Sequence, residues 1–127
     1  MKKRIDSFKH AIRGIRMVLK SETNMQIHLI FVILVVVSGV LFCISTTEWM
    51  LCLLAFGLVT GAEMLNTAIE TIVDLVSPEY HELAGKAKDI AAGAVLISAV
   101  FAAVVGLIIF VPRGVQLGRS IWSYLFN

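Results

Sequence analysis

Three carboxylates and one amide recur at regular intervals within residues 61–74. They follow one another at spacings of three, four and four residues: Glu63, Asn66, Glu70 and Asp74. On a helix such spacings keep returning to one face, so they predict an acidic stripe roughly 16 Å long at ~1.5 Å of rise per residue. Carboxylates beside an amide are suited to bind a divalent cation and to accept a proton during catalysis.

The position of this acidic stripe is unusual, because it continues from an uncharged run, residues 49–60. A membrane span of ~20 residues that begins at Trp49 ends at about residues 65–69. Glu63 and Asn66 then lie within the bilayer, and the rest of the stripe emerges at the headgroups. Ionisable groups at such depth are costly, which indicates a functional site that faces the interior of a helix bundle.

The composition places this chain among integral membrane proteins. Its 127 residues are 58% hydrophobic, with a mean hydropathy of +0.89, which is too apolar for an ordinary soluble domain. We expect one membrane domain, residues 1–127. Cys43 and Cys52 sit in apolar runs, so we expect neither a disulfide nor a metal site from them. Ala87 follows Gly85-Lys86, so no P-loop is present.

The pattern predicts an all-α fold with three transmembrane helices and an amphipathic surface helix. The surface helix is expected at residues 3–21, where apolar residues recur at helical spacing among Lys and Arg. Uninterrupted apolar runs predict transmembrane helices at about residues 26–45, 48–73 and 88–111. Ser77 and Pro78 have the sequence of a helix start, and Pro112 follows the third span. The aromatic residues of the tail, 113–127, fit an interfacial segment.

The distribution of basic residues predicts the orientation. Seven of the eleven Lys and Arg residues precede Thr23, and none lies in the first connection. By the positive-inside rule the N-terminus and the connection 74–89 are cytoplasmic. Glu22, the acidic stripe and the charged residues 79–89 are then all expected near one cytoplasmic surface, which argues for one site.

Physical reasoning leaves two classes of function open. One is an enzyme that acts on a lipid at the interface, with Glu22 and Glu70 holding Mg²⁺ beside phosphate oxygens. The other is a non-enzymatic membrane protein or a cation-conducting oligomer that uses the acidic stripe. A cation path needs ionisable groups across the full membrane depth, and the outer half has almost none, so the enzyme is favoured. His28 is expected to be an interfacial hydrogen-bonding group rather than a ligand.

The segment Glu63-MLNTAIETIV-Asp74 resembles the small prokaryotic diacylglycerol kinase family, which includes the undecaprenol kinases. It satisfies every position of the family signature E-x-[LIVM]-N-[ST]-[SA]-[LIV]-E-x-x-V-D. The downstream EYHELAGKAKD, residues 79–89, is similar too, and the likeness covers about residues 3–112. The stretch SETNMQIH, residues 21–28, looks more like the undecaprenol kinase branch.

The resemblance implies a homotrimer in the bacterial cytoplasmic (inner) membrane, with sites shared between protomers. It implies an ATP-dependent lipid kinase that uses Mg²⁺, with undecaprenol favoured over diacylglycerol as substrate, and no nucleic-acid partner. Glu63 matches the family's catalytic base, Asn66 a polar group beside it, and Glu22 and Glu70 its metal-holding carboxylates. The positions that match nucleotide contacts are Glu79, His81, Lys88 and Asp89, with Lys3 and His10 in the N-terminal arm.

Overall fold

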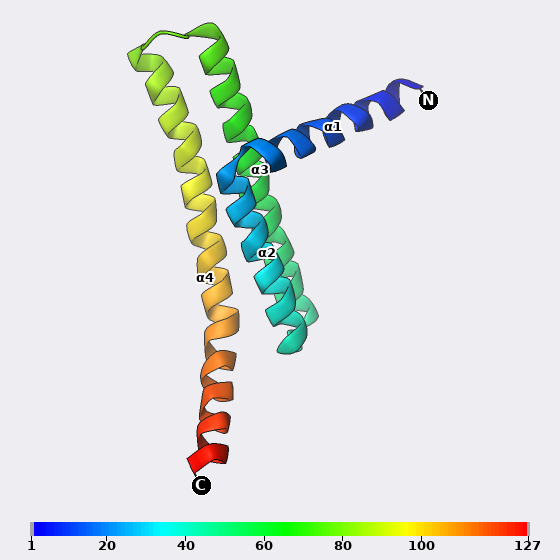
Figure 1. Cartoon of the computed structure of the whole chain (residues 1–127), viewed down its shortest axis with the longest axis vertical. Coiled ribbons are helices and arrows are strands. Elements are labelled where there is room, and N and C mark those ends of the chain that lie inside the picture. The colour runs from blue at the N-terminus through cyan, green and yellow to red at the C-terminus, as the bar shows by residue number, and fades with distance from the viewer. Residues whose placement is uncertain (1, 127) are drawn as a thin grey trace.

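The structure, a computed structural model, is built from helices and describes residues 2–126, with side chains from residue 4. The helices are α1 (Lys2–Ser21), α2 (Thr23–Leu41), α3 (Thr46–Val76) and α4 (Glu82–Phe126). Helices α2, α3 and α4 run alongside one another, and α1 projects sideways from the start of α2 (Figure 1). The prediction of an all-α fold with three long apolar helices is therefore confirmed, and a fourth helix precedes them.

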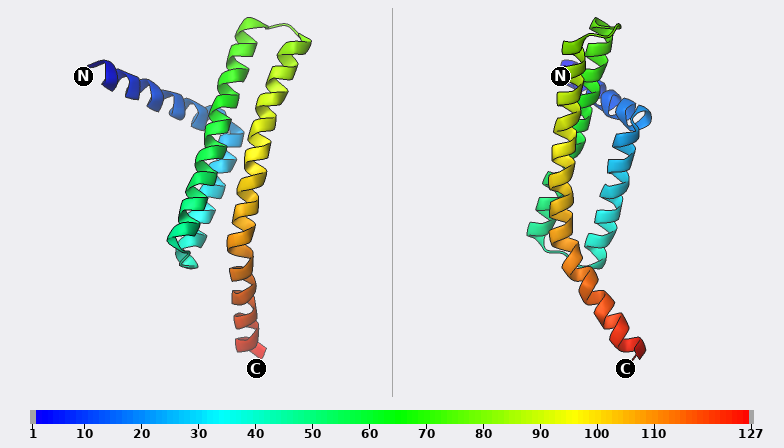
Figure 2. Two further views of the ribbon diagram at one scale, coloured as in Figure 1. Left: turned by 180° about the vertical axis from the view of Figure 1, so that it is seen from behind. Right: turned by 90° about the vertical axis from the view of Figure 1, so that its left-hand side faces the viewer.

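Helix α1 has the geometry of a helix that lies in a membrane surface. It leaves the bundle at a steep angle to α2 in every view (Figures 1 and 2). Its large apolar side chains are exposed, including Phe8 at 72% and Ile12 at 48%, while Val18 near the corner is buried. Gln26 of α2 donates its side-chain amide to the carbonyl oxygen of Leu19 at 3.3 Å, which ties the corner together. The exposed apolar face suits burial among lipid headgroups.

The connection between α2 and α3 lies earlier than expected, at residues 42–45 rather than between the predicted helices 26–45 and 48–73. Gly39 is required there, because a Cβ atom would come within 2.7 Å of the Trp49 ring. Ser45 caps α3, and Glu48 completes a capping box by accepting the Ser45 backbone N–H at 2.8 Å. These backbone bonds start α3 at Thr46 rather than at residue 48.

The connection between α3 and α4 corrects the predicted helix start. Ser77 ends α3 instead of capping α4, and its hydroxyl donates to the Glu79 carbonyl oxygen at 3.1 Å. His81 caps the start of α4 instead. Its Nδ1 accepts a hydrogen bond from the Leu83 backbone N–H at 3.2 Å, and its carbonyl oxygen accepts one from the Gly85 backbone N–H at 3.0 Å. Pro78 therefore lies in the link. The imidazole supplies the side-chain acceptor that we expected from serine.

Helix α4 continues to Phe126, although we expected the third span to end at residue 111. Pro112 lies inside it, and α4 changes direction in this part of the chain (Figure 2). Proline lacks the N–H that would bond the carbonyl four residues earlier, which bends a helix without having to end it. Arg113 supports the next turn by donating Nη1 to the Ile109 carbonyl oxygen at 2.6 Å.

The interior of the bundle is small, and most of its apolar surface faces outward. A buried cluster of Ile44, Cys52 and Ile109 joins α3 to α4 at the end of the bundle near the α2–α3 turn. Along the helices, side chains such as Leu53 and Leu54 are 64% and 71% exposed. Three helices are long and apolar enough to cross a membrane. Outward-facing apolar side chains are expected where lipid is the solvent.

Candidate functional site

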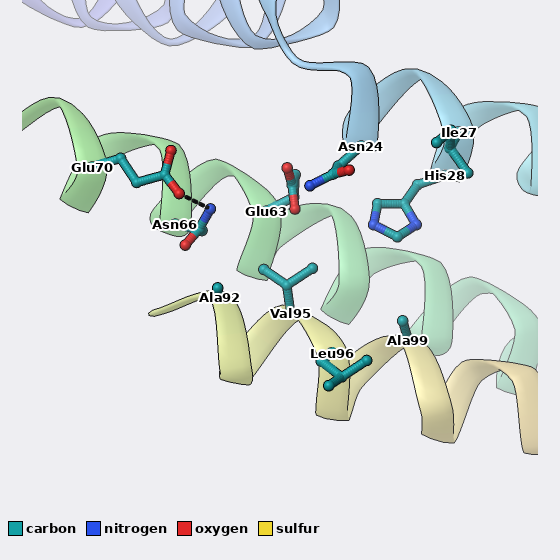
Figure 3. Close-up of a pocket in the computed structure, with 10 residues that line it drawn as sticks. All are labelled: Asn24, Ile27, His28, Glu63, Asn66, Glu70, Ala92, Val95, Leu96 and Ala99. Atoms are coloured by element: carbon teal, nitrogen blue, oxygen red, sulfur yellow. Dashed lines mark hydrogen bonds between the residues drawn. The ribbon is translucent and has the colours of Figure 1, made fainter. Parts of the chain in front are cut away.

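A pocket of about 280 Å³ lies where α2, α3 and α4 meet, near the α1–α2 corner. Its walls differ in chemistry, as Figure 3 shows. Helix α3 contributes Glu63, Asn66 and Glu70, and α2 contributes Asn24, Ile27 and His28. Helix α4 contributes only apolar side chains: Ala92, Val95, Leu96 and Ala99. One polar and one apolar wall suit an amphiphilic ligand.

The predicted acidic stripe does face the bundle over its first two turns. Glu63 is 1% exposed and Asn66 6% exposed, so both are buried among helices, while Glu70 is half-buried. The Asn66 side-chain amide donates to Glu70 Oε1 at 3.1 Å, which holds the two side chains together at one end of the pocket. A carboxylate buried this completely is rare without a functional reason.

Two polar residues of the pocket were not assigned to the site from the sequence. Asn24 and His28 lie one helical turn apart on α2, and the Asn24 amide faces the Glu63 carboxylate (Figure 3). Their four-residue spacing was a signal of a shared polar face, but nothing in it told which helix that face would meet. His28 was expected to be an interfacial hydrogen-bonding group, and the structure places it in the wall of the pocket.

Farther along α3, the acidic stripe ends in an ion pair. Lys88 Nζ donates to Asp74 Oδ1 at 2.8 Å, so α4 brings a positive charge one turn beyond Glu70. Both side chains are accessible to solvent, the Lys88 side chain at 37% and the Asp74 side chain at 65%. Such an accessible lysine is available to a polyanion that displaces the carboxylate.

The remaining predicted site residues do not line this pocket. Glu79 and His81 are exposed in the connection between α3 and α4, roughly 20 Å beyond Glu63 at 1.5 Å per residue. Asp89 is exposed on α4, next to Lys88. Glu22 is half-buried at the α1–α2 corner, where its Oε1 accepts the Ser21 hydroxyl at 2.8 Å. His10 is exposed on α1, and the Lys3 side chain is outside the described residues. One chain thus spreads the predicted residues over α1, the α1–α2 corner and the α3–α4 hairpin.

The donor set at the mouth of the pocket fits Mg²⁺. Among the described residues no three His, Cys, Asp or Glu side chains gather closely enough to enclose a metal ion, but Mg²⁺ needs only one or two carboxylates when phosphates and water complete its shell. Glu70 offers a half-buried carboxylate, and the neighbouring Asn66 Oδ1 is buried without a partner. Both are hard oxygen ligands.

Comparisons with known proteins show which family this chain matches. Residues 9–110 match the profile of the prokaryotic diacylglycerol kinases. The chain is 45% identical to the undecaprenol kinase of Bacillus subtilis over 107 residues, 84% of this chain and 87% of that kinase. It is 38% identical to a diacylglycerol kinase of Synechocystis over 84% of this chain and 61% of that longer kinase. Against the diacylglycerol kinase of Escherichia coli it is 51% identical over 47 residues, 37% of this chain and 38% of that kinase.

Proposed function

Since the chain belongs to the prokaryotic diacylglycerol kinase family, whose members are ATP-dependent lipid kinases, we propose that it transfers the γ-phosphate of ATP to undecaprenol. Membership of an enzyme family decides between the two classes that the sequence left open. The structural observation that carries the proposal is the burial of Glu63. Its carboxylate is 1% exposed in a pocket whose α4 wall is apolar.

Glu63 is the catalytic base in this proposal. The lipid hydroxyl attacks the γ-phosphorus while Glu63 takes its proton, and the bond from that phosphorus to the bridging oxygen of ADP breaks. The products are the lipid phosphate, ADP and a protonated Glu63, which returns its proton to water. Asn66 orients the neighbouring Glu70 through the 3.1 Å hydrogen bond.

Mg²⁺ would be held by Glu70 and by Glu22, whose carboxylate stands at the start of α2. Bound there, the ion would neutralise charge on the ATP phosphates. The nucleotide contacts that we propose are Glu79, His81, Lys88 and Asp89, with Lys3 and His10 on α1. Lys88 lies one turn beyond Glu70 through its pairing with Asp74, which supports a nucleotide that runs from the pocket along the hairpin.

Two observations favour undecaprenol over diacylglycerol. The similarity to the Bacillus subtilis undecaprenol kinase extends over 87% of that protein. The apolar wall from Ala92 to Ala99 also offers no side-chain hydrogen-bond donor. The ester carbonyls of a diacylglycerol can accept hydrogen bonds from such donors, whereas the hydrocarbon chain of a prenol has no group that uses them.

The protein is a multi-pass membrane protein, and we place it in the bacterial cytoplasmic membrane as a homotrimer. Its N-terminus and the connection 74–89 face the cytoplasm, where ATP is available. A shared site between protomers would bring residues of one chain's hairpin to another chain's pocket. This accounts for the spread of site residues along a single chain.

Phosphorylation in mixed micelles tests the substrate. The purified protein is given ATP with undecaprenol and diacylglycerol in parallel at equal mole fraction, and the phosphorylated lipids are separated. We expect undecaprenyl phosphate as the main product. Phosphatidic acid as the main product would overturn the substrate assignment, and no product from either lipid would overturn the lipid-kinase proposal.

A further inference from the structure

Buried polar atoms without a partner are concentrated in the pocket. Within the described side chains, three such atoms are shielded from solvent without a hydrogen bond: His28 Nε2, Glu63 Oε2 and Asn66 Oδ1. All three residues line the pocket. Leaving such a group unsatisfied costs about 1–3 kcal/mol, so folded proteins keep few of them. Their shared location indicates that a ligand supplies the missing bonds.

The three residues have a fixed order along the pocket. Asn66 and Glu70 lie on one side of Glu63, and the His28 ring lies on the other side (Figure 3). His28 follows Asn24 by one turn into the apolar helix α2, so it stands on the membrane side of Glu63. A lipid alcohol that enters from the bilayer therefore meets His28 and Glu63 before it reaches the oxygen ligands at the opposite end.

A single hydroxyl group matches the two atoms on this side. Glu63 Oε2 as a carboxylate oxygen only accepts, and Nε2 of a neutral imidazole with its proton there only donates. A hydroxyl does both, because it has one proton to give and lone pairs to accept with. No other uncharged group of a prenol could satisfy either atom, since the rest of that molecule is hydrocarbon.

We propose that His28 is a hydroxyl-binding residue, whose Nε2–H donates to the oxygen of the lipid alcohol while Glu63 Oε2 accepts the hydroxyl proton. This deepens the lipid-kinase function proposed above and rests on it. Held by both side chains, the oxygen keeps one lone pair directed toward the end of the pocket where the phosphate arrives. The role of His28 is to fix the geometry of attack, which productive transfer requires within a fraction of an ångström.

The test compares two substitutions that differ in hydrogen-bonding capacity. His28→Leu removes the donor, and His28→Gln places an amide N–H at a similar distance from the backbone. We expect kcat/KM for undecaprenol to fall about 10- to 100-fold in His28→Leu, as for a lost hydrogen bond that leaves its buried partners unpaired. We expect His28→Gln to recover most of that loss, and KM for ATP to change less than twofold in both.

Val32→Ala is the matched control, because it removes packing volume one turn deeper on α2, from a half-buried residue that does not line the pocket. It should leave kcat/KM for the lipid within about twofold of wild type, because it removes no polar atom from the pocket. His28→Met replaces His28→Leu if the leucine variant does not reach the membrane.

The outcomes separate this inference from the function on which it rests. A wild-type protein that phosphorylates no lipid overturns the proposed function. An active wild type with an equally active His28→Leu overturns the role of His28 alone, as does a glutamine variant no better than the leucine variant. A KM for ATP that rises as much as the KM for lipid would show a general structural effect and would also overturn it.

Discussion

At the scale of residues, the proposed function rests on Glu63. Its burial and its place between Asn24 and Asn66 (Figure 3) are those of a group kept for chemistry rather than for solubility. A buried charge stabilises a fold only when it is well paired, and Glu63 Oε2 has no partner. The fold therefore tolerates Glu63 at a cost, and its function as a base would explain that cost.

Glu63→Gln keeps the shape of the side chain and removes the basic oxygen. We expect turnover with the lipid alcohol to fall by about 10²- to 10⁴-fold, the usual contribution of a general base, with no loss of thermal stability. Steady-state kinetics in mixed micelles measures this. Glu82→Gln is the matched control, because Glu82 is exposed and, among the described side chains, pairs with Lys86 at 3.4 Å. Wild-type turnover in Glu63→Gln would show that the base lies elsewhere.

Glu70→Gln and Glu22→Gln test the metal site. Each removes one charged oxygen ligand, so we expect the Mg²⁺ concentration for half-maximal activity to rise severalfold while activity at saturating Mg²⁺ is partly recovered. A titration of activity with Mg²⁺ at fixed ATP measures the change. The metal assignment fails if both titration curves coincide with that of wild type, and Glu82→Gln again serves as control.

At the scale of elements, α3 is fixed at both ends by short polar motifs. Its start carries the capping box, and Glu48 Oε2 also accepts from Arg113 Nη2 at 2.9 Å. The pair is only 29% and 22% exposed at the two side chains, so it is screened less than a surface ion pair. Through Arg113 the bend of α4 at Pro112 is tied to the first turn of α3.

Glu48→Ala is therefore expected to lower the Tm by a few degrees, because the variant loses both the cap and a partly exposed ion pair. Thermal unfolding in detergent, followed by circular dichroism, gives the shift in Tm. The site lies at the other end of α3, so lipid-kinase turnover below the transition should stay at the wild-type level. Arg113→Gln should lose the ion pair and the hydrogen bond to the Ile109 carbonyl oxygen while keeping the cap, and equal Tm values for all three proteins would contradict this view.

The last turns of α4, residues 113–126, form a second amphipathic element, which lies outside the family match at 9–110. Their polar side chains occupy one side of the helix, and Trp122 lies among apolar ones. We expect this segment to lie in the outer interface of the membrane. With Trp49→Phe, Trp122 is the remaining tryptophan, and brominated lipids should quench its fluorescence.

Charge placed on either side of this segment gives a control. Ile121→Glu puts a carboxylate on the apolar side and should expose Trp122 to water, whereas Ser120→Glu on the polar side should not. Quenching by a soluble quencher reports the exposure. Equal quenching in both variants would show that the segment does not bind the interface.

At the scale of the whole molecule, one chain leaves much of its apolar surface uncovered. Its helices expose most of their apolar side chains, and the proposed nucleotide contacts extend away from the pocket. Lipid covers some of that surface, and other copies of the chain would cover the rest. A site completed by a neighbour needs an oligomer, so activity and assembly should be lost together.

We therefore expect cross-linking in mild detergent to yield species of up to three copies. When the protein is diluted until cross-linking yields only monomers, we expect kinase activity to be lost as well. Gel electrophoresis of the cross-linked protein measures the copy number. Glu82→Gln, which leaves the bundle untouched, should give the same pattern as wild type. A ladder that ends at two copies would count against the trimer.

The sequence by itself determined the membrane class, the number of spans and the acidic stripe, because hydropathy and helical spacing are local properties. It placed Glu63 and Asn66 toward the bundle, and the structure buries both. Helix ends were less accurate, since caps depend on which side chain reaches the backbone: His81 does so where Ser77 was expected.

Only the tertiary structure decided which helices face the stripe. The packing of α2 and α4 against α3 brings Asn24, His28 and an apolar wall to Glu63, and no local pattern records the rotation of one helix about its axis relative to another. The tertiary structure also separates the end of the α3–α4 hairpin from the pocket. That separation follows from the length of α3, which continues past the crossing of α1 before the chain turns (Figure 1).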